Sequence, residues 1–186
     1  MSATPRSRSM RTRTVSEEVL YPDDRVVMVD RGDIDALKRA AGGTRRLRSR
    51  LCTHPDAGDA LHEMLIVHAR GTYVRPHRQR LGKSESLHMI EGELDLVLFD
   101  DNGGIMTVMR MGEFQSGKLF YYRVAESFFH TLLIRSETAV FHETTNGPFQ
   151  PGDTEFAPWA PEESDAEAVA AFIGALEARL PSEEAR

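Results

Sequence analysis

The stretch Gly71-Thr-Tyr-Val-Arg-Pro-His77-Arg-Gln79, followed by Glu85 and Gly92, carries the strongest indication of both the fold and the chemistry of this chain. On a β-strand, residues two apart share a face, so His77 and Gln79 point to the same side. A turn after Gln79 returns the chain, and Glu85 then lies beside them on the adjacent strand. The spacing therefore predicts an imidazole, an amide and a carboxylate clustered on one face of a sheet.

A second histidine, His130, opens a later strand after two aromatic residues. Imidazole nitrogen, amide oxygen and carboxylate oxygen together suit Fe, Mn, Ni, Co or Zn. We therefore expect a divalent transition metal whose ligands are His77, Gln79, Glu85 and His130. Glu85 is also the predicted catalytic group, because a carboxylate at such a site can move a proton.

The sequence on either side of this cluster has the rhythm of an all-β protein. Short apolar or alternating runs, separated by Gly, Asp, Asn or Ser, recur about every ten residues between 61 and 149. The predicted strands are 61–69, 72–77, 85–90, 93–99, 105–111, 119–124, 129–134 and 139–144, with a hairpin turn at 100–104. Before them we expect a strand at 25–30 and a helix at 34–41 capped by Asp33. After them we expect an amphipathic helix at 165–180.

The run from Gly71 through His77, Gln79 and Glu85 to Gly92 resembles the first motif of the cupin superfamily. The family's second motif supplies another histidine, and His130 is the matching position. The resemblance implies an all-β fold, a single cupin jelly-roll β-barrel with a metal inside one mouth. To this barrel we add an N-terminal strand/helix lead-in and a C-terminal α-helix.

More narrowly, the chain resembles the WbuC-type cupin-fold metalloproteins. The residues that carry this resemblance are Arg46-x-Arg48, His54, Tyr73-Val-Arg-Pro-His77, Lys83 to Gly92, Asn146-Gly-Pro-Phe149 and Phe156-Ala-Pro-Trp159-Ala-Pro161. The resemblance implies an association with surface-polysaccharide (lipopolysaccharide O-antigen) biosynthesis.

The chain departs from the cupin pattern at three places. Gln79 stands where the usual motif has a second histidine, and an amide oxygen is a weaker ligand than imidazole for these metals. The stretch from Gln79 to Glu85 is longer than usual, so a bulge or a wider turn must absorb the difference. Ala125 and Ser127 occupy the places of the ordinary proline and glycine of the second motif.

Further polar side chains are predicted to face the barrel interior and bind substrate. An arginine directed into a barrel is costly unless it is paired, so each one either forms an ion pair with a carboxylate such as Glu85 or binds an anionic ligand. Strand 61–69 leaves open which face is interior, so His62 or His68 either lines the pocket or packs elsewhere. The predicted substrate-binding residues are Tyr73, Arg75, Tyr121, Arg123 and Glu143.

Composition narrows the class of protein. The 186 residues carry a net charge of −6, which argues against nucleic-acid binding, and no apolar run is long enough for a membrane helix. The single cysteine, Cys52, excludes an internal disulfide and a multi-cysteine zinc site. We expect a cytoplasmic protein that forms a homodimer, because jelly-roll sheets hide their edges by pairing. The expected divisions are a disordered basic tail (1–20), an α/β lead-in (21–60), the barrel (61–162) and a C-terminal helix and tail (163–186).

These features leave competing functions open. The first is a metal-dependent enzyme acting on a small sugar-like or anionic metabolite by isomerase- or epimerase-like proton transfer. A metal-dependent oxygenase is a variant of it, and this variant requires a redox-active metal. The alternative is a non-catalytic protein that binds the same kind of small molecule in the barrel.

Overall fold

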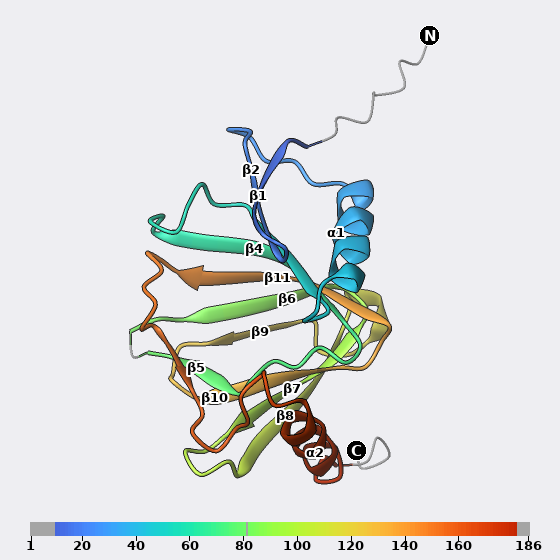
Figure 1. Ribbon diagram of the computed structural model, residues 1–186, viewed down its shortest axis with the longest axis vertical. Coiled ribbons are helices and arrows are strands. Elements are labelled where there is room, and N and C mark those ends of the chain that lie inside the picture. The colour runs from blue at the N-terminus through green and yellow to red at the C-terminus, as the bar shows by residue number, and fades with distance from the viewer. Residues whose placement is uncertain (1–9, 81, 182–186) are drawn as a thin grey trace.

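The computed structural model describes residues 10–80 and 82–181 and consists mainly of two β-sheets that face each other (Figure 1). The predicted all-β jelly-roll fold is thereby confirmed. The first nine residues of the predicted basic tail, Leu81 and the end of the C-terminal tail (182–186) lie outside the described residues.

Each sheet collects strands from distant parts of the chain. In spatial order, the seven-stranded sheet contains β1 (Thr12–Ser16), β2 (Val19–Pro22), β3 (Arg48–Cys52), β4 (Leu61–Ala69), β11 (Thr138–Asn146), β6 (Glu85–Glu91) and β9 (Tyr121–Val124). The five-stranded sheet contains β12 (Thr154–Phe156), β5 (His77–Gln79), β10 (Phe129–Ile134), β7 (Glu93–Phe99) and β8 (Ile105–Gly112), and the 3₁₀ turn η1 (Phe114–Ser116) follows β8. Neighbouring strands are antiparallel except β2 and β3, which run parallel.

The main core lies between the sheets, because alternate residues of each strand point inward. Leu87 and Met89 of β6 meet Leu94 and Leu96 of β7 and Phe141 of β11, and all of these side chains are buried. On β4 the inward face carries His62, Met64, Ile66 and His68. The sequence left open which face of this strand is interior, and the structure shows that it is the face with the two histidines. Val67 packs on the other side of the sheet.

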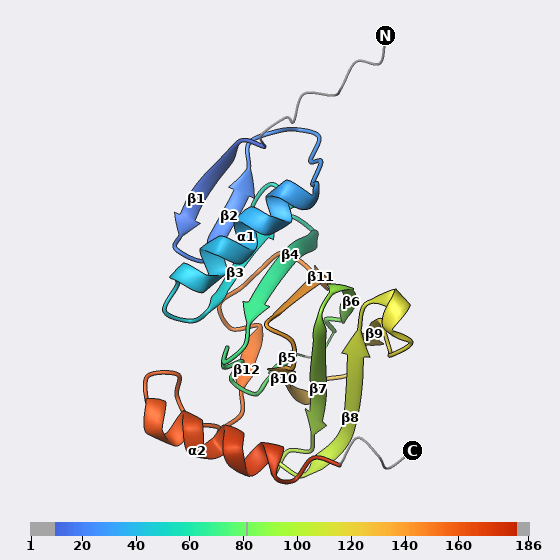
Figure 2. The same ribbon diagram turned by 90° about the vertical axis from the view of Figure 1, so that its right-hand side faces the viewer.

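Helix α1 (Arg31–Gly43) covers the outer face of the seven-stranded sheet, where Leu37 packs over Leu51 and Val67 (Figure 2). It begins three residues before the predicted start, because Asp30 is the N-cap rather than Asp33. The Asp30 carboxylate accepts from the Asp33 amide at 3.1 Å, and the Asp33 carboxylate accepts from the Asp30 amide at 3.0 Å. This reciprocal capping satisfies two amides that the helix itself leaves free.

Helix α2 (Ala166–Glu177) covers the outer face of the five-stranded sheet and forms within the predicted 165–180 segment. Its Phe172 packs against Trp159, whose ring lies 5.1 Å from that of Phe99 on β7. The Trp159 indole nitrogen also donates to the carbonyl oxygen of Asp101. These contacts fix the segment between β12 and α2 against the sheet, near the mouth of the interior cavity described below. None of the helices in the described ranges has the length and apolar character needed to cross a bilayer.

The N-terminal region differs from the prediction. The expected disorder over 1–20 is wrong for residues 12–20, because β1 and β2 form an antiparallel hairpin whose second strand extends the sheet beside β3. The expected strand at 25–30 does not form, and this stretch leads into α1 instead. The expected strand at 72–77 forms only from His77 onward, since Pro76 just before it has no amide hydrogen to donate.

Candidate functional site

His77 and His130 lie directly opposite each other on the adjacent strands β5 and β10, with ring centroids 4.5 Å apart. Each ring is oriented by its own backbone. Nδ1 of His77 is 2.9 Å from the carbonyl oxygen of Arg75, and Nδ1 of His130 is 3.3 Å from that of Phe128. A carbonyl can only accept, so each Nδ1 carries the hydrogen and Nε2 is the nitrogen left to bind something else. The predicted meeting of the two imidazoles is confirmed.

Glu85 completes the cluster from β6 on the opposite sheet. Its carboxylate is 4% exposed and accepts from the Tyr122 hydroxyl at 2.7 Å and from the Gln79 side-chain amide at 3.3 Å. Oε1 of Glu85 also lies 3.4 Å from Nε2 of His130. Burial by itself raises the pKa of Glu85, but the nearby histidines and these hydrogen bonds outweigh burial and hold the pKa at about 2. Glu85 is therefore an anion at neutral pH.

The two histidines respond to this anion differently. Burial, followed by the proximity of His130, lowers the pKa of His77 to about 4. Burial also disfavours the charged form of His130, but the attraction of Glu85 outweighs it and raises the pKa of His130. His77 is thus a neutral imidazole at neutral pH, which is the form that binds a metal.

The residue types of this cluster fit a divalent transition metal, because two imidazole nitrogens and one carboxylate are a common ligand set for such ions. Within residues 10–80 and 82–181, however, no three His, Cys, Asp or Glu side chains already form a ligand cage. The Gln79 amide gives its NH₂ group to Glu85 rather than turning its oxygen toward the histidines. As placed, the ligands nearest to a shared ion are His77, His130 and Glu85.

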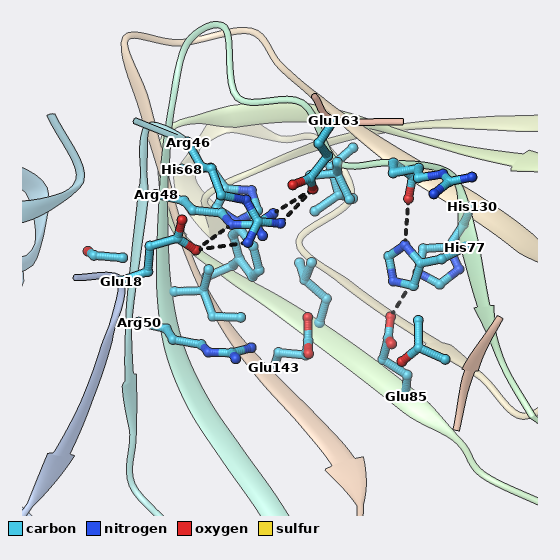
Figure 3. A pocket seen from close by; sticks show the side chains of 18 of the residues that line it. Glu18, Arg46, Arg48, Arg50, His68, His77, Glu85, His130, Glu143 and Glu163 are labelled. Atoms are coloured by element: carbon cyan, nitrogen blue, oxygen red, sulfur yellow. Dashed lines mark hydrogen bonds and ion pairs between the residues drawn. The ribbon is translucent and has the colours of Figure 1, made fainter. Parts of the chain in front are cut away.

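The cluster forms one end of a cavity of about 260 Å³ between the two sheets (Figure 3). The remainder of its wall is mixed, with apolar side chains from the inner faces of both sheets and several arginines. The lining residues used below are Glu18, Arg46, Arg48, Arg50, His68, Arg75, Tyr122, Glu143 and Glu163. This volume lies just below the usual range for small-molecule sites, roughly 300–1,000 Å³.

Glu143 of β11 lines the cavity on the same side as Arg50 (Figure 3). Burial, followed by the negative charge of Glu85, raises its pKa to about 8, and the attraction of Arg50 only partly offsets this. The predicted inward orientation of Glu143 is confirmed. His142 points outward, with Nε2 3.8 Å from the Glu63 carboxylate. Away from the arginine-paired Glu18 and Glu163, the cavity therefore presents an ionised carboxylate, Glu85, and a carboxylic acid, Glu143.

The opposite end of the cavity is dominated by arginines. Arg48 donates from Nε to Glu18 at 2.9 Å, and Arg46 donates from Nη2 to Glu163 at 2.5 Å. Arg75 pairs with Glu162 at 2.6 Å, and its guanidinium lies 4.9 Å from the centre of a phenylalanine ring on β12. The pairs with Glu162 and Glu163 connect the segment before β5 and the start of β3 to the short segment that precedes α2, and the pair with Glu18 connects β3 to the turn between β1 and β2.

The predicted substrate-binding residues fall into separate places. Arg75 and Glu143 line the cavity, but Arg75 pairs with Glu162 rather than with either carboxylate of the interior. The Tyr73 hydroxyl donates to the carbonyl oxygen of Pro161 at 3.0 Å, and Tyr73 is not part of the cavity wall. The expected inward orientation of Tyr121 and Arg123 is wrong, because both are exposed.

The register of β9 explains this correction. Tyr122 pairs with Leu87 of β6, which points inward, so Tyr122 faces the cavity and its two neighbours face away. The sequence pattern did not predict the cavity-lining side chains of β3, because Arg-rich stretches are more often exposed to solvent. The alternation of Arg48, Arg50 and Cys52, with the apolar Leu51 between them, is the signal that indicates a strand there.

Comparison with known proteins adds little beyond the general fold. Residues 29–111 match the model of a domain of unknown function (DUF6016), and no curated protein sequence matches the chain. Among solved structures, the chain is similar to an oxalate oxidase in complex with the substrate analogue glycolate, at 14% identity and a TM-score of 0.48 over 62% of this chain. It is also similar to an oxalate decarboxylase from Bacillus subtilis, at 16% identity and a TM-score of 0.46 over 59% of this chain. A cupin domain from Schizosaccharomyces pombe is similar at 9% identity and a TM-score of 0.42 over 55% of this chain.

The chain spans 58%, 27% and 66% of the lengths of these three structures, respectively. Such distant likenesses carry no argument about what the chain binds. The class defined by the fold is an all-β jelly roll, and the function has to be argued from the cavity itself.

Proposed function

We propose that this chain is a cupin-fold metalloprotein that binds a divalent transition metal through His77, Glu85 and His130 and a small polar or anionic metabolite in the adjoining cavity. The observation that carries the proposal is the direct cross-strand pairing of His77 with His130, at 4.5 Å between rings, with Glu85 beside them. Both Nδ1 atoms face carbonyl oxygens, so both Nε2 atoms are available on the cavity side.

A bound metal would polarise a carbonyl or hydroxyl group of the metabolite. The chain itself supplies the groups that hold and move a proton. Glu85 offers a carboxylate with a low pKa, and Glu143 offers a carboxylic acid with a pKa of about 8. Two carboxyl groups whose environments push their pKa values apart are the usual arrangement for acid–base chemistry. This pair favours an isomerase- or epimerase-like proton transfer, with Glu85 and Glu143 in the acid–base roles.

A second candidate is a protein that only binds its small molecule. It is favoured by Gln79, whose amide NH₂ is directed at Glu85, so that the ligand set is one imidazole short of the usual cupin motif. An oxygenase is a variant of the enzyme and requires Fe, Mn, Ni or Cu at the site. A role in surface-polysaccharide metabolism rests on the WbuC-type resemblance, which includes the segments at 146–149 and 156–161.

Elemental analysis of the purified protein tests the metal site. We expect the chain to take up close to one equivalent of a transition metal after it has been stripped with a chelator and incubated with Mn²⁺, Fe²⁺, Ni²⁺, Co²⁺ or Zn²⁺. His77→Ala and His130→Ala should lose this uptake. His88→Ala is the matched control, because His88 lies on the outer face of β6 against Phe120.

The outcomes separate the candidates. A stoichiometric redox-active metal would support the enzyme with its oxygenase variant, and stoichiometric zinc would leave only proton transfer. Protein that binds no metal, and whose melting temperature does not change when metals are added, would overturn the metal site and favour the binding protein. Circular dichroism of the alanine variants confirms that lost uptake is not lost folding.

A further inference from the structure

The arginine end of the cavity contains polar atoms that lack a partner. In the described part of the chain, the buried atoms Nε of Arg46, Nε of Arg75 and Nδ1 of His68 make no hydrogen bond, and all three residues line this cavity. His68 is 8% exposed and lies on the inward face of β4, beside the arginines of β3. Buried polar groups are almost always paired. Three such groups around one cavity give its arginine end a hydrogen-bonding capacity that the chain itself does not meet.

His68 acts here as a neutral group. Burial, followed by the positive charges of Arg50 and Arg46, lowers its pKa to about 3. A neutral imidazole has one N–H to donate, whereas the guanidinium of an arginine has several. The available groups are thus mostly donors, and the ligand that satisfies them must be an acceptor.

Glu163 already places a carboxylate at this end. It accepts from Nη2 of Arg46 at 2.5 Å and lies 3.7 Å from Nη1 of Arg48. Its side chain is 28% exposed, more than the 13% of Glu18, which pairs with the same two arginines from the turn between β1 and β2. Figure 3 shows Glu163 entering between the arginine end and the histidine end of the cavity. Of the two carboxylates, Glu163 is therefore the one that a ligand can more easily displace from Arg46 and Arg48.

The charge balance at this end favours replacement of the Glu163 carboxylate by another carboxylate. Arg46 and Arg48 balance Glu18 and Glu163, so a ligand carboxylate in the place of Glu163 keeps the balance. Arg50 also lines the cavity, and no ion pair to its guanidinium is found in the described ranges. The cavity volume of about 260 Å³ suits a small acid rather than a nucleotide.

We propose that Arg46, Arg48 and His68 form a carboxylate-binding subsite, which a small carboxylic acid fills by displacing the Glu163 side chain. The subsite stands on its own geometry. Only the position of the ligand's other end, facing His77 and Glu85, rests on the proposed function. The ligand class is then a small carboxylic acid with a second polar group at its far end.

Calorimetric titration with glutarate tests the subsite in protein stripped of metal by a chelator. Arg46→Met should weaken glutarate binding at least about tenfold, since it removes a charge-assisted hydrogen bond. Glu163→Gln should strengthen binding, because the internal competitor loses its charge. Arg135→Met is the matched control. Arg135 is also half-exposed and holds two carboxylates, Asp95 and Glu177, but it lies outside this cavity.

Two results would overturn the subsite: unchanged or weaker glutarate binding by Glu163→Gln, or equal binding by Arg46→Met and Arg135→Met. The Glu163→Gln variant is expected to bind glutarate more tightly, and impaired folding would not produce tighter binding. Metal content is measured on the same variants. A chain that takes up no metal but follows the predicted glutarate pattern would contradict the metal site alone, and full metal uptake without that pattern would contradict the subsite alone.

Discussion

The hydroxyl of Tyr122 donates a hydrogen bond to Oε1 of Glu85 across 2.7 Å, on the wall of the cavity that also contains His130. Burial, followed by the charge of Glu85, raises the pKa of Tyr122 well above its ordinary value, so the hydroxyl stays protonated and remains a donor. The bond orients the carboxylate that we propose as a metal ligand. Partners of this kind commonly change metal affinity by about 10–100-fold.

Tyr122→Phe should therefore weaken metal binding by about tenfold or more, because Glu85 loses a hydrogen bond that orients it. Tyr121→Phe is the control, since the adjacent Tyr121 is 50% exposed and faces away from the cavity. Competitive titration with a chromogenic chelator measures both affinities. Equal affinities in the two variants would show that this hydrogen bond does not support the metal site.

The amide at position 79 gives a second prediction. Gln79→His restores a second imidazole on the His77 strand, and imidazole binds first-row transition metals better than an amide does. We expect metal affinity to rise by about tenfold, whereas Gln79→Ala should change it by no more than a few-fold, since Gln79 directs its nitrogen at Glu85. The same competition titration measures the change. A large loss of affinity in Gln79→Ala would instead identify the amide as a ligand.

His68 predicts a dependence of stability on pH. Its pKa is about 3 in the folded chain against 6.5 for an unperturbed histidine, so the unfolded state takes up the proton first as the pH falls. Stability is then present in full above pH 6.5 and is lost progressively toward pH 3. At pH 5 the loss amounts to about 2 kcal/mol, from roughly 1.4 kcal/mol for each pH unit below 6.5.

His68→Gln removes this titration. Between pH 7.5 and pH 5, the melting temperature of the natural sequence should fall by about 4–8 °C more than that of the variant, since 1 kcal/mol corresponds to roughly 2–4 °C in a chain of this size. Thermal unfolding followed by circular dichroism gives both values. An identical fall in the two proteins would mean that His68 titrates normally and is not a buried neutral side chain.

Gly92, which closes the cupin-like motif, gives a prediction about folding. Its φ is +80°, and a side-chain carbon there would collide with the backbone carbonyl oxygen of Thr138. Gly117 has a similar φ of +75° but open space around it. Both alanine variants bear the cost of a positive φ, about 1–2 kcal/mol. Only Gly92→Ala adds a collision, so it should be the less stable of the two by about 2 kcal/mol or more in urea unfolding. Equal stability would contradict the close packing of these strands.

The barrel strands were predictable because their alternating pattern is strong. Strands 61–69, 93–99 and 129–134 match β4, β7 and β10 from end to end. The meeting of His77, Glu85 and His130 followed from the period of the strands and the spacing of one motif. The hairpin β1–β2 and strand β3 were not predicted, because the polar Thr, Ser and Arg side chains of β1 and β3 resemble solvated chain and the apolar run of β2 (Val19–Pro22) is short. They form because β3 pairs with the edge of the sheet at β4, β2 then pairs with β3, and β1 pairs with β2.

The arginine end of the cavity was beyond the reach of sequence patterns. Arg46 and Glu163 are 117 residues apart in the chain, and only the packing of the segment before α2 brings them together. Tyr122 was missed for a different reason. In a short edge strand, a shift of one residue exchanges the two faces, and the pairing of β9 with β6 fixes the register. The expected homodimer stays a prediction, which sedimentation equilibrium would test.

The most direct test of the central claim is anomalous X-ray diffraction from metal-loaded crystals, recorded on both sides of the metal absorption edge. We predict a single strong peak within about 2.0–2.3 Å of Nε2 of both His77 and His130, with Glu85 completing the ligand set. A peak bound elsewhere in the molecule, or metal-loaded crystals with no peak between these two rings, would contradict the account.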